Sequence, residues 1–129
     1  MIVEKVVAGY ARYNAGERTP ELDYWHEDAE FHASSMDPDT SVHRGIEAIR
    51  KQFTTWEDAY PDLRVEILEA KGTGDDVFAW VQFVGHGAAS GVPIEMELAH
   101  VHTFRGDRVA RLVEYPTRAE ALKAVGLSD

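Results

Sequence analysis

Residues 99–109 read AHVHTFRGDRV, and this stretch decides the fold. Up to its glycine it has the period of two residues that is typical of a β-strand. Gly106 and Asp107 then form a two-residue turn of the glycine-first kind, so the chain folds back on itself. We therefore expect an antiparallel hairpin with strands over residues 94–104 and 108–115.

More strands precede this hairpin. Residues 65–68 mark a strand that ends in the glycine-containing turn at 72–75, and residues 77–85 form the next strand. Residues 30–33 are a shorter candidate strand nearer the N-terminus. The second half of the chain is therefore predicted to be a meander of long strands.

Helical patterns flank the strands. Apolar residues recur at helical spacing over residues 3–13, and the clearest helix starts near residue 45 and stops before Pro61. A proline-containing start predicts a short helix over 19–25, and a capping box opens a last helix over 117–126. The order predicts an α+β fold in which helices pack on one face of an antiparallel sheet. If the sheet is strongly curved, helices and sheet enclose a cavity for a small molecule.

Composition narrows the class of protein. The chain has 129 residues, of which 44% are hydrophobic and 28% charged, and this length fits a single domain over residues 1–129. Its net charge of −10 argues against binding to nucleic acid or to an anionic membrane surface. It has no cysteine and no apolar run of about 20 residues, and we expect no secretion signal. We expect a cytoplasmic protein.

Two histidines are the leading catalytic candidates. His100 and His102 lie two residues apart on one predicted strand, so both point to the same face. On a concave, partly dry face at least one of them stays neutral and can act as a base near pH 7. The alternative is that both are half-buried sheet residues satisfied by hydrogen bonds. His86 or Glu114 could add a third metal ligand, but the spacing fits no specific metal motif, so no metal is expected.

The hairpin register leaves two alternatives for a charged neighbour of the histidines. With a strict two-residue turn, Arg111 shares the histidine face, and a bulge in either strand replaces it with Glu114. An inward Glu114 would orient an imidazole and raise its basicity, whereas an inward Arg111 would favour an enolate or a carboxylate. Each of the two could also be a surface residue.

Most of the aromatic residues belong to the core, and some could line a cavity for a flat, hydrophobic ligand. The preferred pocket residues are Tyr13, Trp56 and Trp80. His43 is expected near the mouth of the pocket.

Three segments carry a resemblance to a known family. Residues 43–50, HRGIEAIR, resemble the start of the third helix of SnoaL-like proteins, which belong to the nuclear-transport-factor-2-like superfamily. Residues 99–109 look like the family's penultimate strand, although the turn here is Gly-Asp where the family usually has Asp-Gly. Residues 111–127 are similar to its closing strand and helix. The resemblance implies a cone-shaped α+β barrel, often dimeric through its sheet.

The superfamily includes polyketide cyclases, ketosteroid isomerase, other enzymes and pure binding modules, so the fold does not choose a function. In the resemblance to ketosteroid isomerase, its tyrosine falls at Gly9 and its general base at Ala33. A steroid-isomerase mechanism is therefore not expected. The same alignment places His100 on the concave face, in the pocket.

These observations favour a cofactor-free enzyme of the cyclase, isomerase or dehydratase kind, acting on a hydrophobic carbonyl compound. His100 would be the base or acid, and His102 or Arg111 would stabilise the oxyanion. The alternative is a non-catalytic ligand-binding or dimerisation module of the same fold. We also expect a homodimer, because an open sheet with an apolar outer face needs to be covered.

Overall fold

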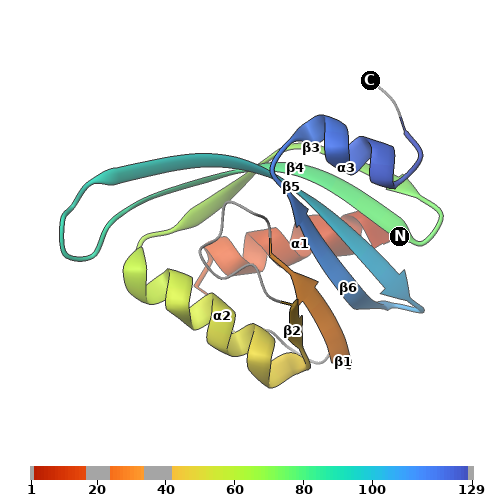
Figure 1. The fold of residues 1–129 in the computed structure, drawn as a ribbon, viewed down its shortest axis with the longest axis horizontal. Helices are drawn as coiled ribbons and strands as arrows, with labels where there is room; N and C mark the ends of the chain where they lie inside the picture. The colour runs from red at the N-terminus through yellow and green to blue at the C-terminus, as the bar shows by residue number, and fades with distance from the viewer. Residues whose placement is uncertain (1, 17–23, 34–41, 128–129) are drawn as a thin grey trace.

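A bent six-stranded sheet has helices on both of its faces (Figure 1). The computed structural model describes residues 2–16, 24–33 and 42–127. In these ranges no helix is long and apolar enough to cross a membrane. The elements are, in chain order, α1 (Ile2–Asn14), β1 (Trp25–His32), β2 (Val42–Arg44), α2 (Ile46–Ala59), β3 (Arg64–Thr73), β4 (Asp76–His86), β5 (Pro93–Arg105), β6 (Arg108–Tyr115) and α3 (Arg118–Ala124).

The strand order is β2-β1-β6-β5-β4-β3. Strands β3 to β6 form the predicted antiparallel meander, and Gly106 takes the positive φ of 68° that a glycine-first turn requires. β1 adds to β6 in parallel, which makes the sheet mixed. The α+β fold with a curved, unclosed sheet is confirmed, and the parallel pair is a feature that the local pattern did not predict.

Helices α1 and α2 cover the concave face. Val6 of α1 is only 1% exposed, and a Cβ on Gly72 of β3 would lie 2.7 Å from Val3, so helix and strand approach closely. Ile49 of α2 is fully buried in the same core. The buried members of this core are Val6, Tyr24, Trp25, Ala29, Phe31, Ile46, Ile49, Val77, Phe104, Val109 and Leu112.

Helix α3 packs on the opposite, convex face, where Ala121 and Leu122 cover Phe78 of β4. Its predicted capping box is confirmed, since the Thr117 hydroxyl accepts a hydrogen bond from the Glu120 backbone N–H. The expectation that all helices share one face was therefore wrong. The last helix is amphipathic on its own and closes over strands that are apolar on both sides.

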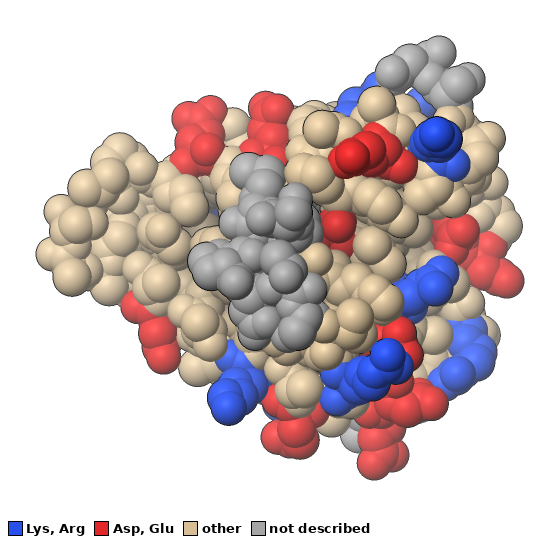
Figure 2. Space-filling model, in the orientation of Figure 1, with Lys and Arg blue, Asp and Glu red and all other residues tan. Residues whose placement is uncertain are grey.

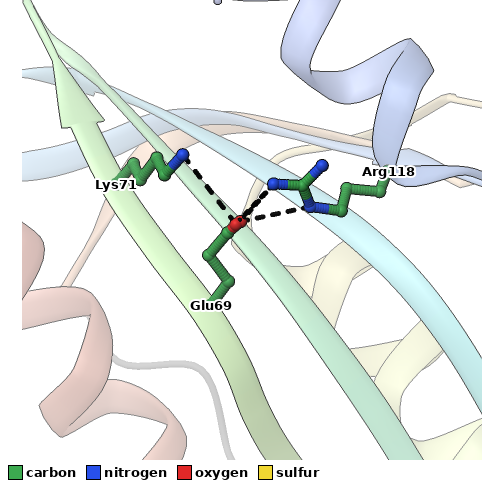
Figure 3. Close-up of polar contacts among 3 residues, drawn as sticks. All are labelled: Glu69, Lys71 and Arg118. Carbon is green, nitrogen blue, oxygen red and sulfur yellow. Dashed lines mark hydrogen bonds and ion pairs between the residues drawn. The ribbon is translucent and has the colours of Figure 1, made fainter. Parts of the chain in front are cut away.

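An ion pair holds α3 across the convex face (Figure 3). The Arg118 guanidinium donates to both carboxylate oxygens of Glu69 on β3 at 2.6 and 2.7 Å, and Lys71 lies 3.9 Å from the same carboxylate. α3 thus covers part of the outer face within one chain. The homodimer stays a prediction. The argument that an apolar outer face needs to be covered applies only to the strands that α3 leaves uncovered.

Element boundaries follow the sequence most closely where the pattern is strongest, as in α2. β1 is longer than the candidate strand over residues 30–33 and begins at Trp25, which is buried against Phe53. The predicted helix therefore does not include Trp25, and Tyr24 before it lies in a turn. Residues 19–23 of that helix and the predicted loop over 34–41 lie outside the described residues.

Val6 and Val7 offer a matched test of how α1 is held on the sheet. Val6→Ala should lower the free energy of unfolding by about 2 kcal/mol, because it removes two buried methyl groups and leaves a cavity. Val7 is 42% exposed, so Val7→Ala should change it by less than about 0.5 kcal/mol. Urea denaturation measures both, and equal losses would contradict this packing.

Candidate functional site

A β-bulge in the closing hairpin decides which side chains face the histidines. Phe104 pairs with Val109, but the preceding Thr103 pairs with Arg111, so Ala110 is an extra residue on β6. Beyond this point every β6 side chain lies on the face opposite to the one that a strict hairpin would give it.

The bulge places Glu114 directly opposite His100 on the concave face. Arg111 pairs with Thr103 and lies on the convex face. There the hydrogen bond with His32 lowers the pKa of Glu30, and the charges of Arg44 and, to a smaller extent, Arg111 lower it further. Of the two alternatives that the sequence left open, the structure has the inward carboxylate. Arg111 therefore lies away from the histidines and is no candidate for the oxyanion donor.

His100 and Glu114 form a buried pair. The His100 Nε2 lies 2.9 Å from Glu114 Oε2, and their side chains are only 5% and 10% exposed. The Phe83 ring meets the imidazole edge-on at 5.8 Å between centroids. With so little water nearby, the electrostatic part of this hydrogen bond is stronger than at the surface.

The Tyr10 hydroxyl bridges the two histidines. It lies 2.7 Å from His100 Nδ1 and 2.8 Å from His102 Nε2. The other nitrogen of His102, Nδ1, lies 3.1 Å from the Tyr24 hydroxyl. Sequence analysis missed both tyrosines as site residues. Tyr10 stood in the apolar stripe of the first helix, where a core tyrosine and a site tyrosine have the same pattern.

Burial keeps this cluster uncharged at three positions. It lowers the pKa of His102 well below its usual value, and the neighbouring His100 lowers it further. Burial also raises the pKa of Tyr10, with smaller contributions from Tyr24 and Glu114. Burial raises the pKa of Tyr24 as well, and the positive charge of Arg12 opposes this shift only in part. His102 is thus a neutral imidazole held by two hydroxyl groups, which does not favour its predicted role at the oxyanion.

Two further predicted residues lie on the histidine face. Tyr13 packs against the buried cluster of Val65, Ala79 and Val81, which includes the residue that pairs with His100. The His43 ring lies 6.0 Å from the Phe31 ring between centroids. His43 pairs with Phe31, which pairs with Leu112, which in turn pairs with His102, so all four residues lie on the same face of the sheet.

The two predicted tryptophans are not brought to the histidines. Trp80 pairs with Ala99 and packs against the α3 cluster on the convex face, so the prediction that it lines the same cavity was wrong. The period of two residues predicts which residues of a strand share a face with Trp80, but it does not tell which face of the sheet becomes the concave one. Trp56 stacks on Tyr60 at the C-terminal end of α2, with ring centroids 5.8 Å apart.

The remaining histidine that was considered as a ligand lies elsewhere. His86 Nδ1 is 2.7 Å from Asp62 Oδ2, and both side chains are more than half exposed. Within the described residues, no group of three or more His, Asp or Glu side chains could hold a metal ion.

An open groove of about 810 Å³ lies between the end of α2 and the β4–β5 hairpin. The groove is lined by residues 58–60, 87–90 and 92–95. No member of the histidine cluster borders it. The tip of this hairpin, residues 87–92, has no charged side chain and projects as an uncharged lobe in Figure 2. The groove is therefore separate from the buried cluster.

The fold is that of the nuclear-transport-factor-2-like and ketosteroid-isomerase-like proteins. The profile of the SnoaL-like domain matches residues 6–112, and the chain belongs to this family. The resemblance seen in the sequence is confirmed.

Solved structures share the whole architecture at low identity. A candidate SnoaL-like polyketide cyclase from Jannaschia sp. CCS1 is 16% identical, with a TM-score of 0.78 over 99% of this chain and 93% of that one. IdmH, a candidate polyketide cyclase from Streptomyces antibioticus, is 17% identical, with a TM-score of 0.76 over 98% and 99%. A Catenulispora acidiphila protein with a ketosteroid-isomerase-like fold, in complex with trimethylamine, is 20% identical, with a TM-score of 0.73 over 95% and 92%.

A search of curated protein sequences gave no significant match. At these identities the structural neighbours establish the fold alone. The family relationship suggests a protein that holds a small molecule in a pocket, without specifying a reaction.

The neutral state of His102 gives a pH dependence. Below the ordinary histidine pKa of about 6.5 the unfolded chain binds a proton at this residue, whereas the folded protein does not. The free energy of unfolding should therefore decrease as the pH is lowered. His102 should account for as much as about 2 kcal/mol of this decrease between pH 7 and pH 5. In His102→Gln that part of the loss should disappear. Urea denaturation at both pH values tests this, and an equal loss in both proteins would refute it.

Proposed function

We propose that this protein is a cofactor-free enzyme that moves a proton on a small hydrophobic carbonyl compound, as cyclases, isomerases and dehydratases do. The Glu114–His100 pair would be its acid–base group. The observation that carries the proposal is the 2.9 Å hydrogen bond between these two side chains, which are only 5% and 10% exposed.

The Glu114 carboxylate is held in place by its hydrogen bond to the Nε2 of His100. A proton that the pair takes up can lie on either side of this hydrogen bond. Removing a proton next to a carbonyl group requires a base that is fixed within hydrogen-bond reach of it, and this pair is such a group.

The geometry suggests how the pair would meet a substrate. Both ring nitrogens of His100 have partners, and Glu114 is the more exposed member. An ionised carboxylate only accepts, whereas a neutral imidazole whose two nitrogens are both hydrogen-bonded has no further acceptor site. We therefore assign the contact with the substrate proton to Glu114, assisted by His100. This revises the expectation that His100 alone is the base.

The surroundings favour an apolar substrate. Phe83 and Tyr13 lie on the same face as the pair and would pack against a flat hydrophobic body. Family membership supports a small-molecule ligand, and the polyketide-cyclase candidates among the neighbours are consistent with a carbonyl compound.

The proposal can be tested with 2-tetralone, a hydrophobic ketone whose protons next to the carbonyl exchange slowly with D2O. The wild type should accelerate this exchange over buffer, as followed by proton NMR. Glu114→Gln keeps the shape of the side chain but cannot take up the proton, so it should lose about 100-fold or more of the acceleration, and His100→Gln should be similarly impaired.

Glu97→Gln is the matched control, since it makes the same change at an exposed residue on the other face of β5. It should leave the exchange rate unchanged. Equal rates for the wild type and Glu114→Gln would overturn the proposal. If 2-tetralone binds, as judged by ligand line broadening, but does not exchange faster, the non-catalytic binding module replaces the enzyme.

A further inference from the structure

Four hydrogen bonds join five side chains into one continuous chain through the core. Its order is Tyr24, His102, Tyr10, His100 and Glu114. The successive donor–acceptor distances, from the Tyr24 end, are 3.1, 2.8, 2.7 and 2.9 Å. The proposed function uses only the last two members, so the other three need their own explanation.

Proton accounting fixes the direction of this chain. A neutral imidazole has one N–H and one acceptor nitrogen, and a tyrosine hydroxyl has one proton to donate. When Glu114 is ionised it can only accept, so a neutral His100 carries its proton on Nε2. Its Nδ1 must then accept from Tyr10.

The same rule continues along the chain. Having donated its proton, the Tyr10 oxygen must accept from the Nε2–H of His102. The Nδ1 of His102 then accepts from the Tyr24 hydroxyl. In this state both histidines carry their proton on Nε2, and all four hydrogen bonds point towards Glu114.

We propose that Tyr10 and His102 are positioning residues that act as a reversible proton relay between Tyr24 and the Glu114–His100 pair. This inference rests on the proposed function and extends it by giving the pair a route for proton exchange that does not pass through the substrate.

The relay conserves protons at every step. Tyr24 gives its proton to His102 Nδ1, His102 gives its Nε2 proton to Tyr10, and Tyr10 gives its own to His100 Nδ1. His100 can pass its Nε2 proton on to Glu114, and the Tyr24 oxygen regains a proton from a hydronium ion of the solvent, which becomes water. No electrons are transferred, and one proton has entered at Tyr24 for each one that reaches the pair.

The end state has a definite signature. All the hydrogen bonds between Tyr24 and His100 are reversed, and His102 carries its proton on Nδ1 while remaining neutral. Protonation of the pair therefore changes the tautomer of His102 through the Tyr10 hydroxyl, which bonds both imidazoles.

The relay draws its members from several elements. α1 contributes Tyr10, β6 contributes Glu114, and Tyr24 precedes β1. The charge of Arg12 acts on Tyr24, and the β4 residues that pair with the two histidines are Ala79 and Val77, which do not titrate. The four hydrogen bonds give a continuous polar connection between Tyr24 and Glu114.

Nitrogen-15 NMR of histidine-labelled full-length protein tests the relay without a substrate. As the pH is lowered, the wild type should show the His102 proton moving from Nε2 to Nδ1 with the same midpoint as the titration of the Glu114–His100 pair. Tyr10→Phe keeps the ring but removes the bridging hydroxyl, so the His102 tautomer should no longer follow that titration.

Tyr115→Phe is the control, because it makes the same change on the convex face, and coupling should persist in it. An unchanged His102 tautomer across the titration of the wild type would overturn the relay, as would persistent coupling in Tyr10→Phe. The result is independent of the 2-tetralone assay. A coupled tautomer change without catalysis would refute the proposed function and leave the relay, whereas catalysis without coupling would do the reverse.

Discussion

The site depends on one extra residue in a β-strand. Side chains alternate between the faces of a sheet, so the bulge at Ala110 inverts the orientation of the rest of β6. Without it, His100 would face a surface bearing Arg111 and Tyr115 in place of Glu114. The bulge therefore decides whether a buried imidazole meets a carboxylate or a guanidinium, and with it the kind of chemistry that the concave face can support.

The polar cluster is compatible with the core because its members satisfy one another. An isolated hydroxyl or imidazole at this depth would cost several kcal/mol of desolvation, about the size of a small domain's whole stability. Here Tyr10 and His102 each bond two neighbours, so that cost is offset by hydrogen bonds of good length. Because Tyr10 comes from α1, the apolar packing of Val6 also helps to hold the Tyr10 hydroxyl against His100.

The SnoaL-like scaffold explains the shape of the molecule and leaves the chemistry to individual side chains. Neighbours at 16–20% identity keep the same arrangement of helices and sheet over almost their whole length. A curved sheet covered by helices creates a concave face whatever residues point into it. In this chain that face carries a hydrogen-bonded cluster of one carboxylate, two imidazoles and two phenols, with apolar side chains packed around it.

The sequence by itself determined the features that depend on neighbours along the chain. These are the glycine-first turn at residues 106–107, helix α2, the capping box at Thr117, and the common face of His100 and His102, because periodicity and turn chemistry are local. Only the tertiary structure decided the bulge at Ala110, the parallel pairing of β1 with β6 and the partner of His100 in Tyr10, 90 residues away. Those features follow from how separate elements pack, and a strand's pattern is the same whichever of its faces becomes concave.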